Sequence, residues 1–171
     1  MNDAAQDFVA EAREYLRGHY LPKIERCLER LTDEQVWWRA NPESNSVGNL
    51  LLHLEGNARQ WVVAGVGRGP EVRDRDGEFA ARGAVSREEL LGSLRATLAE
   101  VDAVLARLDA GALAERRRIQ GRDVTVLAAV FHVVEHFSMH AGQILLLTKM
   151  LTAADLAFYD FTGGAPREAW R

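Results

Sequence analysis

Histidines recur at helical spacing in the most apolar part of this sequence. His132, His136 and His140 follow one another at intervals of four residues. Two histidines one turn apart on a helix point the same way and can share one metal ion. Three in a row cannot all bind one ion, because eight residues of helix span about 12 Å. One outer histidine is therefore left out, and a further ligand must come from another helix.

His53 is the candidate for that further ligand. It lies in a second apolar helical segment, with Asn49 and Asn57 about one turn to either side. The alternative is that these histidines are core residues whose ring nitrogens bind neighbouring polar groups. Burying three or four imidazoles without a metal leaves many polar nitrogens to satisfy. Spacing alone leaves both interpretations open.

The spacing of apolar residues also predicts the elements that position these histidines. Apolar residues recur at helical intervals in four long segments, which we expect to form four helices. Thr32 and Gln35 have the capping-box pattern and predict a short helix through Trp37, while Ser46 and Ser86 are the expected caps of two long helices. The predicted long helices cover residues 4–31, 46–65, 86–108 and 124–150.

The first of these helices contains Pro22, which we expect to bend it without ending it. The last one is apolar nearly all round, so we expect it to be the most completely buried.

Three remaining segments lack the helical pattern. Residues 66–85 are rich in glycine and charged side chains, so we expect a long polar connection without a core of its own. Such a length permits a crossover between helices that are not antiparallel neighbours. Residues 109–123 are predicted to be a loop, and the aromatic tail over residues 151–171 is expected to pack across one end of the helices.

Composition limits the class of protein. A chain of 171 residues suits one domain over residues 1–171 with a single core. The formal net charge of -4 lacks the basic surplus of a nucleic-acid-binding protein. The apolar segment 124–147 contains Glu135 and three histidines, which argues against a membrane span. No apolar leader is visible near the N-terminus, so we expect a cytoplasmic protein.

The segment HFSMHAGQI, from His136 to Ile144, resembles the H-x-x-x-H-x-G-Q signature of the DinB-like superfamily. NLLLHLEGNARQW resembles that family's second-helix histidine segment, and the likeness extends from NPESNSVGNLLLHLEGN to the tail AFYDFTGGAPREAW. The resemblance implies an all-α four-helix bundle of up-down-down-up topology, with a long crossover between helices 2 and 3. It also implies frequent dimers and a divalent metal held at one end by three histidines.

Mapped by motif, the metal ligands implied by this resemblance are His53, His136 and His140. His132 has no place in the pattern, so we assign it to packing or to the surroundings of the ligands. Three neutral imidazoles leave coordination positions open, as in catalytic rather than closed structural sites. Nitrogen ligands fit zinc, nickel, copper or iron, and we favour zinc or nickel. Water or a thiol bound there would lose its proton more readily.

A general base cannot be identified from the sequence, so the catalytic residues stay unknown. Glu55 and Glu135 are turned away from their neighbouring histidines by the helical period. Asn49, Asn57 and Gln143 lie within a turn of the ligands and are predicted to orient imidazole rings, as is His132. Arg59, Tyr159 and Asp160 are further side chains that could reach a pocket, although each suits an ordinary surface or packing position.

The resemblance implies two enzymatic functions and one that is not enzymatic. In the first, which we favour because no carboxylate base is evident, the protein is a metal-dependent S-transferase that uses a low-molecular-weight thiol as co-substrate. In the second it is a metal-dependent hydrolase. In the third it is a stress-associated dimer whose metal is structural or vestigial. We expect a small-molecule substrate and a homodimer, and a buried structural role for the single cysteine, Cys27.

Overall fold

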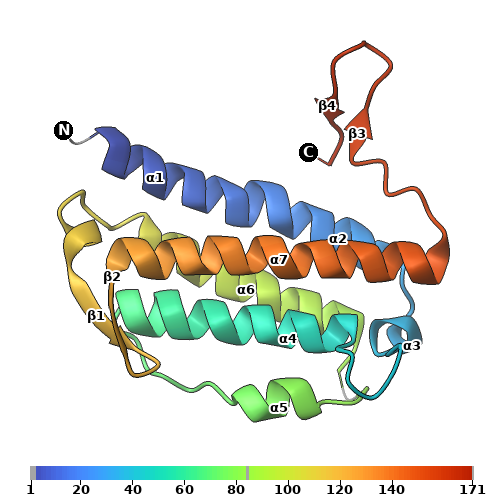
Figure 1. The fold of residues 1–171 in the computed structure, drawn as a ribbon, viewed down its shortest axis with the longest axis horizontal. Coiled ribbons are helices and arrows are strands. Elements are labelled where there is room, and N and C mark those ends of the chain that lie inside the picture. Colours follow the sequence, from blue (N-terminus) through green and yellow to red (C-terminus); the bar gives the residue numbers. More distant parts are fainter. Residues whose placement is uncertain (1–2, 84, 171) are drawn as a thin grey trace.

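The protein is described by a computed structural model over residues 3–83 and 85–170, and it is mostly helical (Figure 1). The long helices lie side by side around an apolar core. The helices are α1 (Asp3–Glu14), α2 (Leu21–Glu29), α3 (Asp33–Val36), α4 (Val47–Ala58), α5 (Arg75–Ala80), α6 (Arg87–Leu105) and α7 (Val126–Thr152). The π-helical segments η1 (Tyr15–Tyr20) and η2 (Arg59–Val66) extend α1 and α4, and η3 (Ala112–Ala114) is a 3-10 turn. Two hairpins pair β1 (Arg116–Ile119) with β2 (Arg122–Thr125) and β3 (Tyr159–Asp160) with β4 (Arg167–Glu168).

Polar caps begin the helices where the sequence predicted them. The side chains of Thr32, Ser46 and Ser86 each accept a hydrogen bond from the backbone N–H three residues later. In each case the side chain of that later residue bonds back to the cap, which completes a capping box. The predicted starts of α3, α4 and α6 are therefore confirmed.

The first long helix continues through its proline. The segments α1, η1 and α2 follow one another without a break, and Pro22 lies in the first turn of α2. Proline has no N–H to donate to the carbonyl of Gly18, four residues earlier. The indole nitrogen of Trp170 donates to that carbonyl instead, at 3.1 Å. The tail thus compensates locally for the missing donor.

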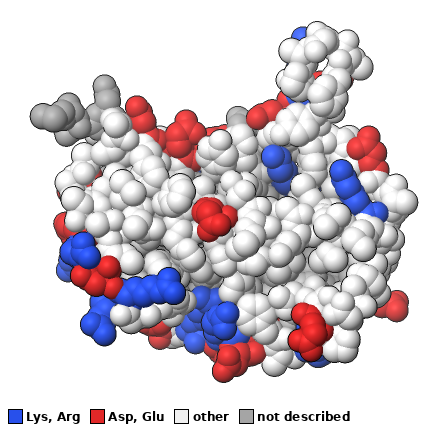
Figure 2. Space-filling view, viewed as in Figure 1, with Lys and Arg blue, Asp and Glu red and all other residues white. Residues whose placement is uncertain are grey.

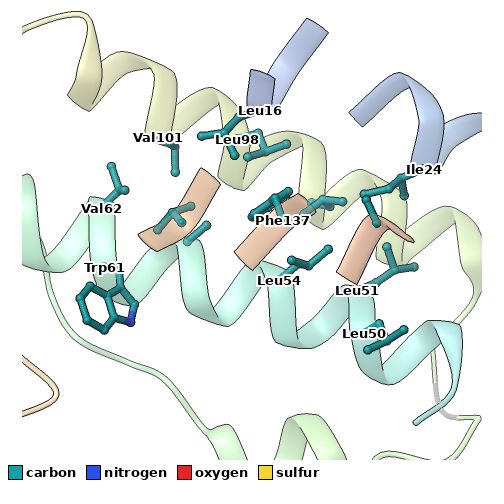
Figure 3. Packing of buried hydrophobic residues seen from close by; sticks show 14 of the residues in the cluster. Leu16, Ile24, Leu50, Leu51, Leu54, Trp61, Val62, Leu98, Val101 and Phe137 are labelled. Atoms are coloured by element: carbon teal, nitrogen blue, oxygen red, sulfur yellow. The ribbon is translucent and has the colours of Figure 1, made fainter. Parts of the chain in front are cut away.

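The core lies where the long helices face each other (Figure 3). Phe137 of α7 is fully buried at its centre, among leucines and valines from the other long helices. Leu54 of α4 and Leu98 of α6 are buried almost completely against it. Removing a phenylalanine from such a position typically costs about 3–5 kcal/mol. This packing fixes the spacing between α4 and α7, the two helices that carry the candidate ligands.

The connection over residues 66–85 is more ordered than predicted. It contains the helix α5, which lies outside α4 in Figure 1. Asp74 caps this helix, and the side chain of Glu78 is buried. The segment is thus a polar connection, as expected, but it also contains a helix and a buried charge that were not predicted. The helical spacing of apolar residues could not reveal α5, because a helix of six residues contains too few apolar residues to show a period.

The segment 109–123 also differs from the predicted loop. Residues 116–125 form the hairpin β1–β2, with Ile119 buried under its turn. The turn residues Gln120 and Gly121 both have positive φ, at 50° and 74°, which matches the twist of a two-residue hairpin. Because the second strand ends at Thr125, α7 begins at Val126, two residues later than expected.

The tail and the exterior of α7 also depart from expectation. The tail runs back along α2: Arg26 donates to the carbonyls of Ala157 and Ala169, and Lys23 lies 3.8 Å from the ring centre of Trp170. The predicted packing across one end of the helices was therefore wrong.

One face of α7 is exposed, including Phe131 at 58 %, so this helix is not the most completely buried. Within residues 3–83 and 85–170, no helix is long and apolar enough to span a membrane.

Candidate metal centre

Three imidazoles meet at the contact between α4 and α7. His53 comes from α4, and His136 and His140 come from successive turns of α7. Each offers one ring nitrogen, and these three nitrogens all lie within 4.8 Å of one another. The Nε2 atoms of His53 and His136 are 2.8 Å apart. The structure thus brings together the three histidines that the sequence motifs indicated, and this cluster could hold a metal ion.

The protons on two of these rings are directed away from the cluster. His140 Nδ1 lies 2.7 Å from Gln143 Oε1, and His53 Nδ1 lies 2.9 Å from Glu78 Oε2. An oxygen at each of these positions accepts a proton carried on Nδ1, which leaves the lone pair on Nε2. Arg73 Nη2 also lies 3.0 Å from His53 Nδ1. The Nε2 atom of His140 is buried and has no hydrogen-bond partner among the described residues. An unsatisfied buried lone pair of this kind is suited to a metal ion.

The separation of the nitrogens fits the same interpretation. Two nitrogens bound to one ion at about 2.1 Å are roughly 3.0 Å apart at a right angle and roughly 3.4 Å apart at a tetrahedral angle; those of His53 and His136 are 2.8 Å apart, within reach of one ion. Burial, together with the neighbouring imidazoles of His140 and His53, lowers the pKa of His136 to about 3. Burial also lowers the pKa of His140. Neutral imidazole is the form that binds metal, so these rings are ready as ligands at neutral pH.

The centre lies along the side of the helices. His136 and His140 occupy the middle of α7, which runs from Val126 to Thr152. The resemblance implied a site at one end of the bundle, and this expectation was wrong. The position follows from sequence, because His136 and His140 both lie ten or more residues from either end of α7.

A buried carboxylate supports the centre, and sequence reasoning missed it. Glu78 of α5 is 8 % exposed, and both its oxygens bind Arg73, at 2.7 and 2.8 Å. Burial raises the pKa of Glu78, but hydrogen bonds from Arg73 and His53 more than offset this, and the pKa lies below its usual value. Glu78 is therefore ionised at neutral pH, and its charge is directed at the Nδ1 side of His53.

A signal for this contact exists in the sequence. Polar or small residues interrupt the apolar pattern of the second long helix at Asn49, His53, Gly56 and Gln60. Intervals of four, three and four residues place them along one face of a helix. Such a stripe on an otherwise apolar helix indicates a polar segment packed against it. The sequence does not indicate which segment that is.

The other predicted supporting residues divide into two groups. Gln143 binds His140 as expected. Asn57 instead binds His132, whose ring packs at a tilt against Trp61 with 4.1 Å between ring centres. Asn49 donates to backbone carbonyls at Glu78 and Ala81, so it holds α5 rather than an imidazole.

The further candidates do not face the cluster. Arg59 is paired with Glu55 and Glu100. Tyr159 and Asp160 form β3 in the tail hairpin, where Tyr159 packs against Trp170. Glu135 is exposed on the outer face of α7. None of these side chains is placed as a base for a reaction at the three histidines.

A cavity of about 500 Å³ lies between α4, η2 and the segment 70–78. Its lining includes Arg73 and Glu78 but none of the three histidines. Glu78 therefore separates the cavity from His53, and the cavity borders the supporting carboxylate rather than the nitrogen cluster.

Comparisons with other proteins place this chain in a family. A conserved protein from Enterococcus faecalis has a similar structure, with a TM-score of 0.67 and 15 % identity over 90 % of this chain and 98 % of that one. A DinB-like protein from Bacillus cereus is also similar, with a TM-score of 0.59 and 18 % identity over 77 % of this chain and 85 % of that one. No curated protein matched. A family profile described as "Protein of unknown function (DUF1572)" matches residues 3–162. Because that match spans nearly the whole chain, the protein belongs to the DUF1572 family, and its fold is DinB-like.

Proposed function

We propose that this protein is a metal-dependent enzyme that transfers a low-molecular-weight thiol to an electrophilic small molecule. The observation that carries the proposal is the convergence of three imidazole nitrogens from His53, His136 and His140. A divalent ion bound there, zinc or nickel by preference, would supply a Lewis acid that favours the thiolate form of an added thiol. Three protein ligands leave positions for such an exchangeable group.

The thiol must come from outside the chain. Cys27 is fully buried in α2, and burial raises the pKa of its thiol to about 11. It is therefore neither accessible nor ionised at neutral pH. In the proposed reaction the external thiol loses its proton to solvent, its sulfur bonds to the electrophilic carbon, and the leaving group departs with the bonding electrons.

The carboxylates near the centre favour transfer over hydrolysis. A metal-dependent hydrolase commonly uses a carboxylate to accept a proton from the attacking water. Glu78 already binds Arg73 and His53 Nδ1, and Glu55 is paired with Arg59, so neither carboxylate is free to accept that proton. Thiol transfer needs no such base, because a thiol ionises far more readily than water.

An activity assay with a chromogenic electrophile tests the proposal. Product formation should require both added metal and added thiol, persist in Cys27→Ala, and disappear in His53→Ala. Ester or amide cleavage without thiol, at a rate that follows bound metal, would support the hydrolase instead. If neither reaction occurs and removal of the metal lowers the melting temperature, the metal has a structural role and stabilises the folded protein.

We further propose that the chain forms a homodimer through the outer face of α7. Large apolar side chains are exposed along this helix at Leu127, Phe131, Met139, Leu146 and Met150. Figure 2 shows that the face over α7 is mostly uncharged. Glu135 is the exposed acidic residue between Phe131 and Met139 on this face. A large exposed apolar surface is typical of an interface between subunits.

Finally, we propose that residues 1–171 form one domain with the up-down-down-up order of four helices. The connections between the long helices contain α3 (residues 30–46), α5 (residues 67–86) and the hairpin β1–β2 (residues 106–125), and the one through α5 is the crossover that links α4 with η2 to α6. A long crossover of this kind lets two consecutive helices run in the same direction.

A further inference from the structure

The crossover is attached to α4 along the polar stripe of that helix. Asn49 Nδ2 donates to the carbonyls of Glu78 and Ala81, at 2.9 and 3.1 Å. Eleven residues further along, Gln60 accepts a hydrogen bond from Arg73 at 2.9 Å. Between these two positions, Gly56 leaves room for the Glu78 carboxylate, because a Cβ at residue 56 would collide with it.

His53 lies at the centre of this attachment. Its Nδ1 and the Nη2 of Arg73 both approach Oε2 of Glu78, at 2.9 and 2.8 Å, and these two nitrogens are 3.0 Å apart. We assign the proton to Nδ1 because Oε2 carries the negative charge. Arg73 also donates from Nε to the other carboxylate oxygen. Both side chains of this ion pair are at least nine-tenths buried, at 4 % and 8 % exposure. The carboxylate is therefore held in one orientation by Arg73 and has His53 as its remaining partner.

We propose that Glu78 and Arg73 are positioning residues of the metal centre, an inference that rests on the proposed binding of metal by the three histidines. Glu78 accepts the proton on His53 Nδ1, which fixes the ring and leaves the Nε2 lone pair facing His136. Arg73 fixes Glu78. Carboxylates that orient a ligating histidine in this way typically change metal affinity by 10–100-fold when they are replaced.

The same contact couples the crossover to the metal. A metal ion on Nε2 makes the Nδ1–H of an imidazole a better hydrogen-bond donor, so the bond to Glu78 strengthens when the ion binds. Linkage is reciprocal: if the attachment of the crossover favours metal binding, metal binding must favour that attachment by the same free energy. Metal should therefore tighten residues 71–81, which also wall the cavity beside α4.

Zinc titration of the full chain, after removal of bound metal by a chelator, tests the positioning role. The dissociation constant, measured by competition with a chromogenic chelator, should rise 10–100-fold in Glu78→Gln. Glu71→Gln is the matched control: Glu71 lies in the same segment and binds Gln60, but does not contact His53. Its dissociation constant should stay within about twofold of wild type. Equal affinity in Glu78→Gln and wild type would overturn the inference while leaving the metal site intact, whereas wild type that binds no zinc would contradict the site itself.

Two measurements on wild type remain decisive if Glu78→Gln does not fold. Nitrogen-15 NMR of the imidazoles should show His53 protonated at Nδ1. Hydrogen exchange of the amides in residues 71–81 should slow when zinc is added, while exchange in the hairpin β1–β2 should not change. A proton on Nε2 of His53 would overturn the proposal, and so would amide exchange rates in residues 71–81 that do not change when zinc is added.

Discussion

The Nε2 atoms of His53 and His136 face each other at 2.8 Å, although 83 residues separate them in the chain. Two imidazole nitrogens at this distance need either a shared proton or a metal ion between them. Burial and the neighbouring imidazoles lower the pKa of His136 to about 3, so its ring is neutral at neutral pH and can bind a metal ion.

Replacing His136 should abolish metal binding, and replacing His132 should not. His136→Ala removes one of three converging nitrogens. His132 lies one turn away, bound to Asn57 and packed against Trp61. Elemental analysis of protein purified without chelators should give about one divalent ion per chain for wild type and His132→Ala, and far less for His136→Ala. Equal metal content in His136→Ala and wild type would contradict the ligand assignment.

Gln143→Ala should weaken zinc binding by roughly tenfold, because Gln143 accepts the Nδ1 proton of His140 and so presents Nε2 to the cluster. Ser138→Ala is a suitable control, since Ser138 is exposed on the same helix. Competition with a chelator measures both. An unchanged dissociation constant in Gln143→Ala would show that burial alone orients His140.

Gly56→Ala and Gly92→Ala should have opposite effects on stability. A Cβ at residue 56 would meet the buried Glu78 carboxylate, and the strain should lower the free energy of unfolding by about 1–3 kcal/mol. Nothing lies within 4 Å of a Cβ at residue 92, in the middle of α6. Alanine there should raise the free energy of unfolding by about 0.5–1 kcal/mol. Urea titration of both variants distinguishes a real clash at residue 56 from a general effect of alanine in these helices.

Asp102→Asn should destabilise the protein at neutral pH but not in acid. Hydrogen bonds and charge from Arg13 and Arg17 lower the pKa of Asp102. A lowered carboxylate pKa adds stability above the unfolded value of about 3.9, and this stability is lost as pH falls through the folded value. Because both arginines are partly exposed, we expect a loss of about 1 kcal/mol at pH 7. Asp123→Asn, in the exposed pair with Arg116, should change stability little. Thermal melts at pH 7 and near pH 2 test the sign, and a loss that persists in acid would contradict it.

Phe131→Arg should dissociate the proposed dimer. Phe131 is 58 % exposed on the outer face of α7, and a charge there would be buried without a partner in the dimer. Val72→Arg alters an even more exposed apolar residue on the crossover and should leave the dimer intact. Light scattering gives the mass directly. Wild type with the mass of one chain at micromolar concentration would exclude the dimer.

Periodicity placed the histidines on two apolar helices, and the family resemblance then selected His53, His136 and His140 as the ligand set. His136 and His140 are one turn apart on a long apolar helix, and the caps at Ser46 and Thr125 fix where α4 and α7 begin. Helical spacing and capping depend only on residues that are close together in the chain, so a single sequence is enough to predict them. The helical parts of the fold follow from the same rules.

Long-range polar contacts could not be found in this way. Glu78 lies in a short charged segment with no period, and its partner His53 is 25 residues away. The hairpin β1–β2 was missed for a different reason. Its turn, Gln120–Gly121, is a weaker signal than Asn-Gly or Asp-Gly, and its first strand consists largely of arginines.

The split of the centre between two helices imposes an order on its assembly. His136 and His140 are brought together by a single turn of α7, which forms within about a microsecond. His53 joins them only when α4 docks across an 83-residue separation, a slower event because a long loop must close first. During folding, the chain therefore presents a two-histidine chelate before the complete site exists. A metal ion present at that stage can be captured by the nascent helix and then enclosed when α4 docks.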